Sequence, residues 1–259
     1  MNLNRILAII ALVLAVLCLC GVAALAVITK NASGITNTTT TTTTPPPDKP
    51  ANTPNVDDVI LPLGEDAGQE YVDKLYFVGD STTYHFFKGG IDRSHLLVPE
   101  SLTLKLSSDI LTLTVGNTGL TIPEAIKEAN AEIVIITVGV NGADSFTEAK
   151  YKSYYKKLIN AIMELSPDTE IILQSVFPVT KEYSELDIGI TNEGIDRLNE
   201  WVKEIAFDLG LRYLDTQSIL KNADGAQIDS YNEEDGVHMN ASAYTKILEY
   251  IRTHPLEKE

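Results

Sequence analysis

Residues 132–138 read EIVIITV, and this stretch decides the fold. After Glu132 it carries no charge, and Thr137 is its one polar residue. A strand with one face in water alternates apolar and polar side chains, whereas a strand covered on both faces is apolar almost throughout. The stretch therefore predicts a buried strand of a parallel sheet with helices on both faces.

Shorter β-rich runs and longer amphipathic runs alternate on both sides of this stretch. The further candidate strands are residues 74–78, 112–115, 170–176 and 212–215. The helical patterns cover residues 121–130, 146–165, 192–209 and 241–254. Strands separated by helices of this length predict a sheet whose neighbouring strands run in parallel. We therefore expect an α/β domain, a three-layer α/β/α sandwich around a central, mostly parallel five-stranded sheet.

An uncharged apolar run fills residues 6–29. At about 1.5 Å per residue it is long enough to cross a bilayer core of about 30 Å. It exceeds the roughly 7 to 15 apolar residues of a typical signal peptide, which favours a permanent transmembrane anchor over a signal cleaved after Ala26. Arg5 precedes the run, so the positive-inside rule places residues 1–5 in the cytoplasm and the bulk of the chain outside. We expect a single-pass protein of the cell membrane with an extracytoplasmic domain; secretion after signal cleavage is the alternative.

Residues 30–68 are rich in Thr, Pro, Asn and Asp, with TTTTTTTPPP at residues 38–47. This composition buries too little apolar surface to offset the entropy of ordering. We therefore expect a disordered linker between the anchor and a domain at residues 69–259. The formal net charge of the chain is −16 at pH 7, which argues against a nucleic-acid partner because phosphate binding needs a basic surface.

Three polar turns lie where a parallel sheet would gather them. Gly79-Asp80-Ser81 follows the first candidate strand, residues 139–142 (GVNG) follow the buried strand, and residues 235–238 (DGVH) precede the last helix. In such folds ligands bind outside the carboxyl ends of the strands. Each turn alone has an ordinary structural explanation, since Asp caps helices and Gly-containing turns are common.

Together, the three turns supply the groups that acyl transfer needs. Ser81 is a candidate nucleophile, which needs a base to take its proton. His238 is the natural base, and Asp235 is placed to hold its imidazole in one tautomer. Gly139 allows close approach of the backbone to a substrate, and Asn141 offers an amide donor to a developing oxyanion.

The order and content of these turns resemble the signature blocks of the SGNH (GDSL-like) hydrolase superfamily, in its bacterial membrane-anchored form, over about residues 72–254. The resemblance implies a serine ester hydrolase with Ser81, His238 and Asp235 as catalytic residues and no metal or organic cofactor. It also implies an oxyanion hole made of the Ser81 amide, Asn141 and the amide of a glycine after the second strand. Gly119 is the best counterpart for that glycine, and Gly116 is a rival.

Gly79, Asp80 and Gly139 are expected to support the site rather than react. The sequence departs from the family pattern at Thr82, where many members carry Leu, and at Gly142, where many carry an Asp that supports the loop. His85 lies one helical turn beyond Ser81, and we interpret it as a packing or surface residue rather than a pocket residue.

The expected substrate is a small-molecule or glycan ester. An enzyme held near the outer membrane face by a linker meets O-acetylated carbohydrates and wall polymers, so deacetylation is the preferred reading. Hydrolysis of lipid or lysophospholipid acyl groups, acyl transfer to a sugar hydroxyl, and a non-catalytic glycan-binding module are the alternatives. No spacing of Cys, His or carboxylate residues suggests a metal site, and the sequence indicates no oligomeric state.

Overall fold

The computed structural model describes residues 55–99 and 106–256. Five strands form one sheet, and each pairs with its neighbours in parallel. In spatial order β2-β1-β3-β4-β5, they are β2 (Leu96–Leu97), β1 (Leu75–Gly79), β3 (Ile133–Thr137), β4 (Glu170–Gln174) and β5 (Arg212–Leu214). The expected three-layer α/β architecture with a five-stranded parallel sheet is confirmed.

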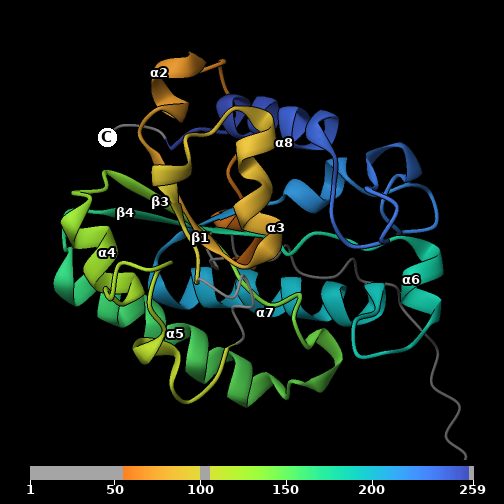
Figure 1. Ribbon diagram of the computed structural model, residues 1–259, viewed down its shortest axis with the longest axis horizontal. Helices are drawn as coiled ribbons and strands as arrows, with labels where there is room; N and C mark the ends of the chain where they lie inside the picture. The colour runs from red at the N-terminus through yellow and green to blue at the C-terminus, as the bar shows by residue number, and fades with distance from the viewer. Residues whose placement is uncertain (1–54, 100–105, 257–259) are drawn as a thin grey trace, which may run out of the picture. The chain divides into compact units, whose positions relative to one another are not determined.

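Helices cover both faces of the sheet, as Figure 1 shows for α5 and α7 on one side and α8 on the other. The α-helices of the described residues are α2 (Gly68–Val72), α3 (Ser81–Tyr84), α4 (Ile122–Glu128), α5 (Glu148–Leu165), α6 (Lys181–Glu185), α7 (Asn192–Leu209) and α8 (Ala241–Thr253). The predicted pattern 192–209 coincides with α7, and the other three predicted helices are present with ends trimmed by one or two residues.

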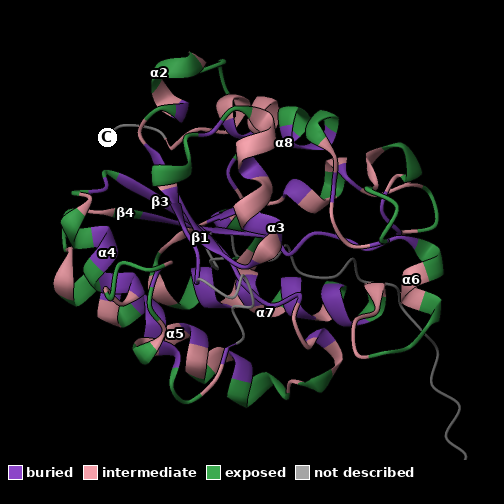
Figure 2. Ribbon diagram, in the orientation of Figure 1, coloured by how far each residue is buried: buried purple, intermediate pink, exposed green. Residues whose placement is uncertain are grey.

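The apolar run at residues 132–138 supplies the centre of two separate cores. Val134 and Ile136 pack in the cluster that includes α5 and α7, whereas Ile133 and Ile135 pack in the cluster that includes α8. Successive side chains of a strand point to opposite faces, so a strand between two helical layers must be apolar at every position. β3 is buried at every position, and Figure 2 shows the strands beside it buried over most of their length.

The predicted strand at residues 112–115 is wrong. The edge position belongs to β2, whose Leu96 and Leu97 pair with Phe77 and Val78 of β1. Residues 111–115 (LTLTV) instead take part in isolated bridges, which join Thr114 to Thr121 and Val115 to Pro99. A two-residue strand leaves almost no periodicity in the sequence, whereas the alternation at 112–115 imitates one.

The domain begins earlier than the boundary expected at residue 69. Val59 and Leu61 are buried, and the amide of Leu61 donates a hydrogen bond to the carbonyl of Tyr213 in β5 at 2.8 Å. The predicted anchor at residues 6–29 and the linker up to residue 54 lie outside the described residues. In the part of the chain that the structure describes, no helix is both long and apolar enough to span a membrane.

Candidate active site

The parallel strands bring their carboxyl ends to one edge of the sheet, and Ser81 lies there as the first residue of α3. Asp80, directly after β1, is the N-cap of this helix: its Oδ1 accepts hydrogen bonds from the Thr82 amide at 3.0 Å and the Thr82 hydroxyl at 2.8 Å. The cap fixes the angle at which the chain leaves the strand. Because Ser81 is the first residue of α3, its amide has no hydrogen-bond acceptor within the helix and lies at the N-terminal end of α3.

The loop at residues 235–238 is shaped by its own carboxylate. Oδ1 of Asp235 accepts hydrogen bonds from the amides of Val237 at 2.9 Å and His238 at 2.8 Å. The side chain of Asn232 accepts a further bond from the amide of Gly236, whose φ of 82° is in the left-handed region. These bonds present Asp235 and His238 on one side of the loop.

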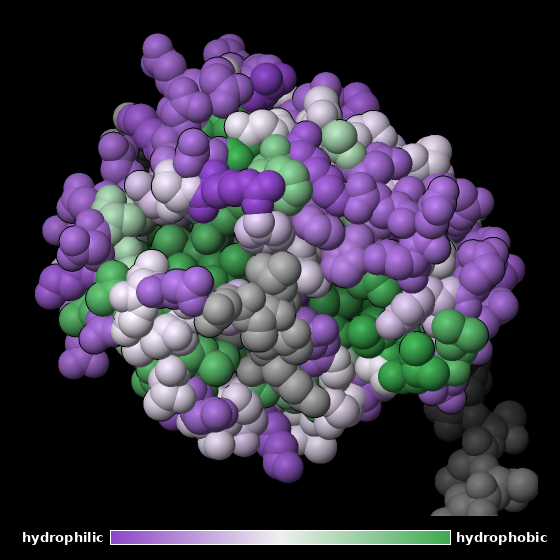
Figure 3. Space-filling view, in the orientation of Figure 1, coloured by the Kyte–Doolittle hydropathy of each residue, from purple (hydrophilic) through white to green (hydrophobic). Residues whose placement is uncertain are grey.

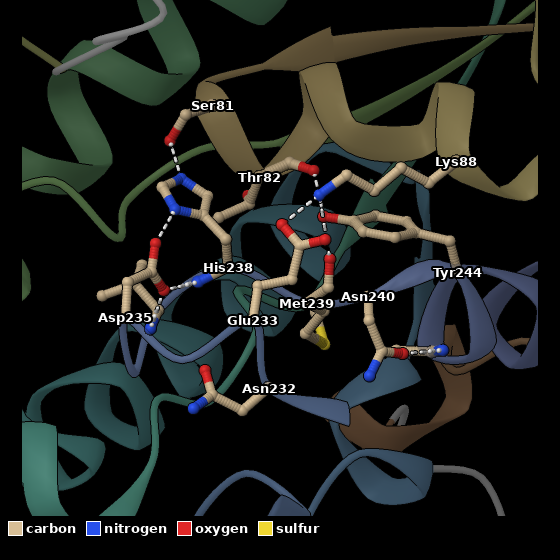
Figure 4. Close-up of polar contacts among 12 residues, drawn as sticks. Ser81, Thr82, Lys88, Asn232, Glu233, Asp235, His238, Met239, Asn240 and Tyr244 are labelled. Carbon is tan, nitrogen blue, oxygen red and sulfur yellow. Dashed lines mark hydrogen bonds and ion pairs between the residues drawn. The ribbon is translucent and has the colours of Figure 1, made fainter. Parts of the chain in front are cut away.

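His238 connects Asp235 to Ser81 across two hydrogen bonds (Figure 4). Its Nδ1 lies 2.6 Å from Oδ2 of Asp235, and its Nε2 lies 2.8 Å from Oγ of Ser81. A carboxylate at Nδ1 favours the tautomer with the proton there, which leaves Nε2 as the acceptor for the serine hydroxyl. The structure thus brings together three residues that the sequence singled out, although 157 positions separate Ser81 from His238.

The electrostatics of this trio keep Asp235 ionised. Partial burial acts to raise the pKa of Asp235, but hydrogen bonds from the His238 ring and from the amides of Val237 and His238 outweigh it and hold the pKa below its usual range. An anionic Asp235 can stabilise a positive charge on His238.

Asn141 lies in the loop directly after β3, at the same edge of the sheet as Ser81. Gly139 in this loop has a φ of +147°, and a Cβ there would lie 2.9 Å from the hydroxyl of Tyr151. Gly142 takes the place of the family's supporting Asp, and the carboxylate of Asp144 nearby accepts a hydrogen bond from Thr191 at 2.8 Å. The loop is therefore tied to the start of α7 from a different position.

The turn at residues 115–121 separates the two glycine candidates. The amide of Gly116 donates a hydrogen bond to the carbonyl of Val98 at 3.0 Å, so it is already engaged. Gly119 has a φ of 73°, and a Cβ at this position would meet nothing within 4 Å. The Gly116 amide is thus engaged with Val98, and the assignment of Gly119 stays a prediction.

Residues 77–246 match the model of the GDSL-like lipase/acylhydrolase family. The chain belongs to this family. The matched segment runs from β1 into α8 and contains Ser81, Asn141, Asp235 and His238, which confirms the resemblance seen in the sequence.

No curated protein matches the sequence. Solved structures with a similar fold include an acetyl xylan esterase at 15% identity and a TM-score of 0.49, over 68% of this chain and 96% of that chain. A GDSL-like lipase from Bacteroides thetaiotaomicron has 16% identity and a TM-score of 0.48, over 71% and 87%. A family two carbohydrate esterase from Clostridium thermocellum has 15% identity and a TM-score of 0.47, over 69% and 61%. At these values the neighbours carry no information about the substrate of this GDSL-like chain.

Two further titratable residues surround the site of this family member. Burial raises the pKa of Asp80, which is 1% exposed, to about 6, and the hydrogen bonds from Thr82 limit the rise. The ring of His85 lies edge-on to that of His238, with 4.7 Å between centroids. Burial, followed by the charge of Lys88, lowers the pKa of His85 to about 4. His85 therefore packs directly against His238. The sequence predicted a packing or surface role for His85 but did not show that it lies beside the site.

A cavity of about 630 Å³ lies beside β2, with Tyr84 of α3 in its wall; Ser81 and His238 are not among the residues that line it. Leu97, Val115, Leu120 and Ala129 give it apolar walls. Figure 3 shows apolar surface in a hollow near α4. Among the described residues no three His, Cys, Asp or Glu side chains are grouped so that they could hold a metal ion.

Proposed function

We propose that this member of the GDSL-like family is a serine ester hydrolase that works through Ser81, His238 and Asp235. One observation carries the proposal: Oγ of Ser81, the imidazole of His238 and the carboxylate of Asp235 form a continuous hydrogen-bonded chain, with contacts of 2.8 and 2.6 Å. Such an arrangement gives a weak hydroxyl nucleophile the base that it needs.

The reaction proceeds in two proton-balanced halves. Oγ of Ser81 attacks the ester carbonyl while Nε2 of His238 takes its proton, and the imidazolium then gives that proton to the leaving alcohol oxygen as the ester bond breaks. Water, which gives a proton to Nε2 of His238, then attacks the acyl-enzyme carbonyl. The imidazolium returns that proton to Oγ of Ser81 as the Oγ–acyl bond breaks, which releases the acid and restores the serine. Asp235 stabilises the transient imidazolium throughout.

The oxyanion of each tetrahedral intermediate would be bound by the amides of Ser81 and Gly119 and by the side chain of Asn141. The position of Ser81 at the start of α3 supports its share, because the first amides of a helix have no acceptor within it. The positive φ of Gly119 supports a role for its amide. The positive φ of Gly139, in the loop that leads to Asn141, supports a role for the Asn141 side chain.

As substrate we propose an O-acetyl ester on a carbohydrate or wall polymer, reached by an extracytoplasmic domain that residues 6–29 anchor in the membrane. The apolar sequence of residues 6–29 and the net charge of −16, which suits a neutral substrate, support this reading. An acylhydrolase for longer chains is the second candidate, because the apolar cavity beside β2, walled in part by Tyr84 of α3, has room for an acyl chain.

The test is hydrolysis of p-nitrophenyl acetate and p-nitrophenyl octanoate by the purified full-length protein in mild detergent. Ser81→Ala should lower kcat/KM by at least about 10³-fold, whereas Ser153→Ala, an exposed serine on α5, should leave it unchanged. Preference for acetate supports deacetylation and preference for octanoate supports the second candidate. Equal, slow rates for the parent and Ser81→Ala would favour a non-catalytic glycan-binding module.

The proposed location has its own test. A membrane-impermeant amine reagent applied to intact cells should label the lysines of the domain, and the labelled chain should stay with the membrane fraction. Labelled protein in the medium would instead indicate signal cleavage and secretion.

A further inference from the structure

Lys88 connects the element that follows Ser81 to the loop that carries His238. It lies in the 3₁₀-helix η2 (His85–Gly89), which continues directly from α3. Its ammonium forms an ion pair with the carboxylate of Glu233 and lies 3.4 Å from the carbonyl oxygen of Met239 (Figure 4). These contacts span 145 and 151 positions of sequence.

Glu233 lies just before the loop at residues 235–238, and Met239 directly follows it. The chain closes the loop at its base, where Asn232 and Met239 form an antiparallel bridge and the amide of Glu233 donates to the carbonyl of His238 at 2.9 Å. The ammonium of Lys88 therefore contacts the chain on both sides of the loop and connects it to η2, the segment that follows Ser81.

The Lys88 side chain is about as buried as those of Lys203 and Lys221, which are 14% and 18% exposed, but its partner Glu233 is less exposed than theirs. The Lys88 side chain is 16% exposed and that of Glu233 37%, whereas the pair Lys246–Glu249 on α8 is 56% and 45% exposed. Charges in a less solvated environment interact more strongly and are screened less by salt. Exposed pairs contribute little, so geometric control is expected from Lys88 and not from Lys246.

Another contact joins the same two parts of the chain but at a different point. The hydroxyl of Tyr244 in α8 donates to the carbonyl of Thr82 at 2.6 Å. This bond fixes the helix that follows the loop against α3. The loop is also held at Gly236, whose carbonyl accepts a hydrogen bond from the amide of Thr180 at 2.8 Å, and Lys88 joins Glu233 and Met239 to the segment after Ser81.

We propose that Lys88 is a positioning residue, whose ammonium holds the loop of Asp235 and His238 at the distance from Ser81 that proton transfer requires. The inference rests on the proposed serine hydrolase function. Lys88 touches no reacting atom; it acts through Glu233 and the Met239 carbonyl. Small displacements of a catalytic base lower the rate steeply, so loss of the tie should slow the chemical step more than substrate binding.

The experiment measures how fast a fluorophosphonate probe labels Ser81 in the full-length protein, because this rate reports activation of the serine whatever the substrate. Lys88→Met, which keeps an unbranched apolar stem, should label about tenfold more slowly or worse, with a matching fall in kcat for p-nitrophenyl acetate and little change in KM. Lys88→Arg should retain most of the rate, and Lys246→Met is the matched control that should change nothing.

A charge exchange separates positioning from general stability. Lys88→Glu should be slow, and Lys88→Glu combined with Glu233→Lys should recover part of the loss, since the ion pair is rebuilt in reverse. If Lys88→Met does not fold, as judged by circular dichroism, Glu233→Gln provides the same measurement with the shape of the side chain retained.

Three results would overturn the inference. Labelling of a folded Lys88→Met or Glu233→Gln protein at the parental rate is the first, and a charge exchange as slow as Lys88→Glu alone is the second. The third is a parent protein that does not label at all. That result refutes the proposed function itself, and it is recognised because it concerns the parent rather than its variants.

Discussion

Gly79 lies so close to Thr137 that a Cβ atom at position 79 would be 2.5 Å from the carbonyl oxygen of Thr137. The two residues are partners in the β1–β3 pairing, at the last position of each strand. The missing side chain thus permits the close approach at the point where the chain turns toward Asp80 and Ser81. This packing explains the glycine better than backbone freedom does, since its φ is not in the left-handed region.

Gly79→Ala should lower the free energy of unfolding by about 2–3 kcal/mol, because the Cβ cannot be placed without moving a backbone carbonyl. The measurement is denaturant unfolding followed by circular dichroism. Gly64→Ala is the matched control, since a Cβ there would be 3.7 Å from Pro255, which is ordinary contact. Equal stability of the two variants would contradict the steric argument.

Asp80→Asn should stabilise the protein increasingly as the pH rises. The folded state holds the pKa of Asp80 at about 6 against a usual value of 3.8, so between these values the folded chain binds more protons than the unfolded chain and its stability falls as the pH increases. The neutral amide avoids this loss, and its advantage over Asp should grow by up to about 3 kcal/mol from pH of about 4 to about 7.

Asp80→Ala provides the control for the cap. It removes the same charge but also the acceptor for Thr82, so it should be about 1 kcal/mol less stable than Asp80→Asn at each pH. The assignment of Asp80 as a buried, ionisable cap would be wrong if the difference between Asn and Asp were the same at all pH values.

His85→Gln should change the pH dependence of the stability in the direction opposite to Asp80→Asn: the advantage of the variant over the parent should grow as the pH falls. The pKa of His85 falls to about 4 from a usual 6.5, through burial and the charges of Lys88 and His238, against Glu233 and Asp235. Between these values the unfolded chain binds more protons, so parental stability is lost as the pH falls through this window, and the variant should lose less. Nuclear magnetic resonance of the His85 ring should show no titration above a pH of about 5; a midpoint near 6.5 would contradict the prediction.

Ala129→Phe should discriminate between acyl chains if the cavity beside β2 holds the acyl group. Ala129 lines this cavity at the end of α4, so a phenyl ring should lower kcat/KM for p-nitrophenyl octanoate by about tenfold and that for the acetate by less than about twofold. Lys127→Ala, an exposed change on the same helix, should affect neither ester. Equal losses on both esters would exclude the cavity as an acyl site.

Part of the fold was predictable because its signal is local. The apolar run in β3 and the amphipathic pattern of α7 each indicate burial within a short stretch of sequence. Both elements form at the predicted residues. The edge strand Leu96–Leu97 has two residues and no periodicity, so its place is decided by pairing with Phe77 and Val78. The residues of the site were likewise found by the turns that carry them.

The sequence by itself determined the two-sided burial of the sheet, the family, and the residue types at Ser81, Asp235 and His238. Only the tertiary structure decided which neighbours hold them: the edge-on ring of His85 and the tie from Lys88 to Glu233. In the sequence His85 and Lys88 are ordinary polar residues. No local pattern around Lys88 indicates that its partner is Glu233, 145 positions away. Periodicity encodes burial locally, whereas a contact between distant segments exists only once the sheet has gathered their ends.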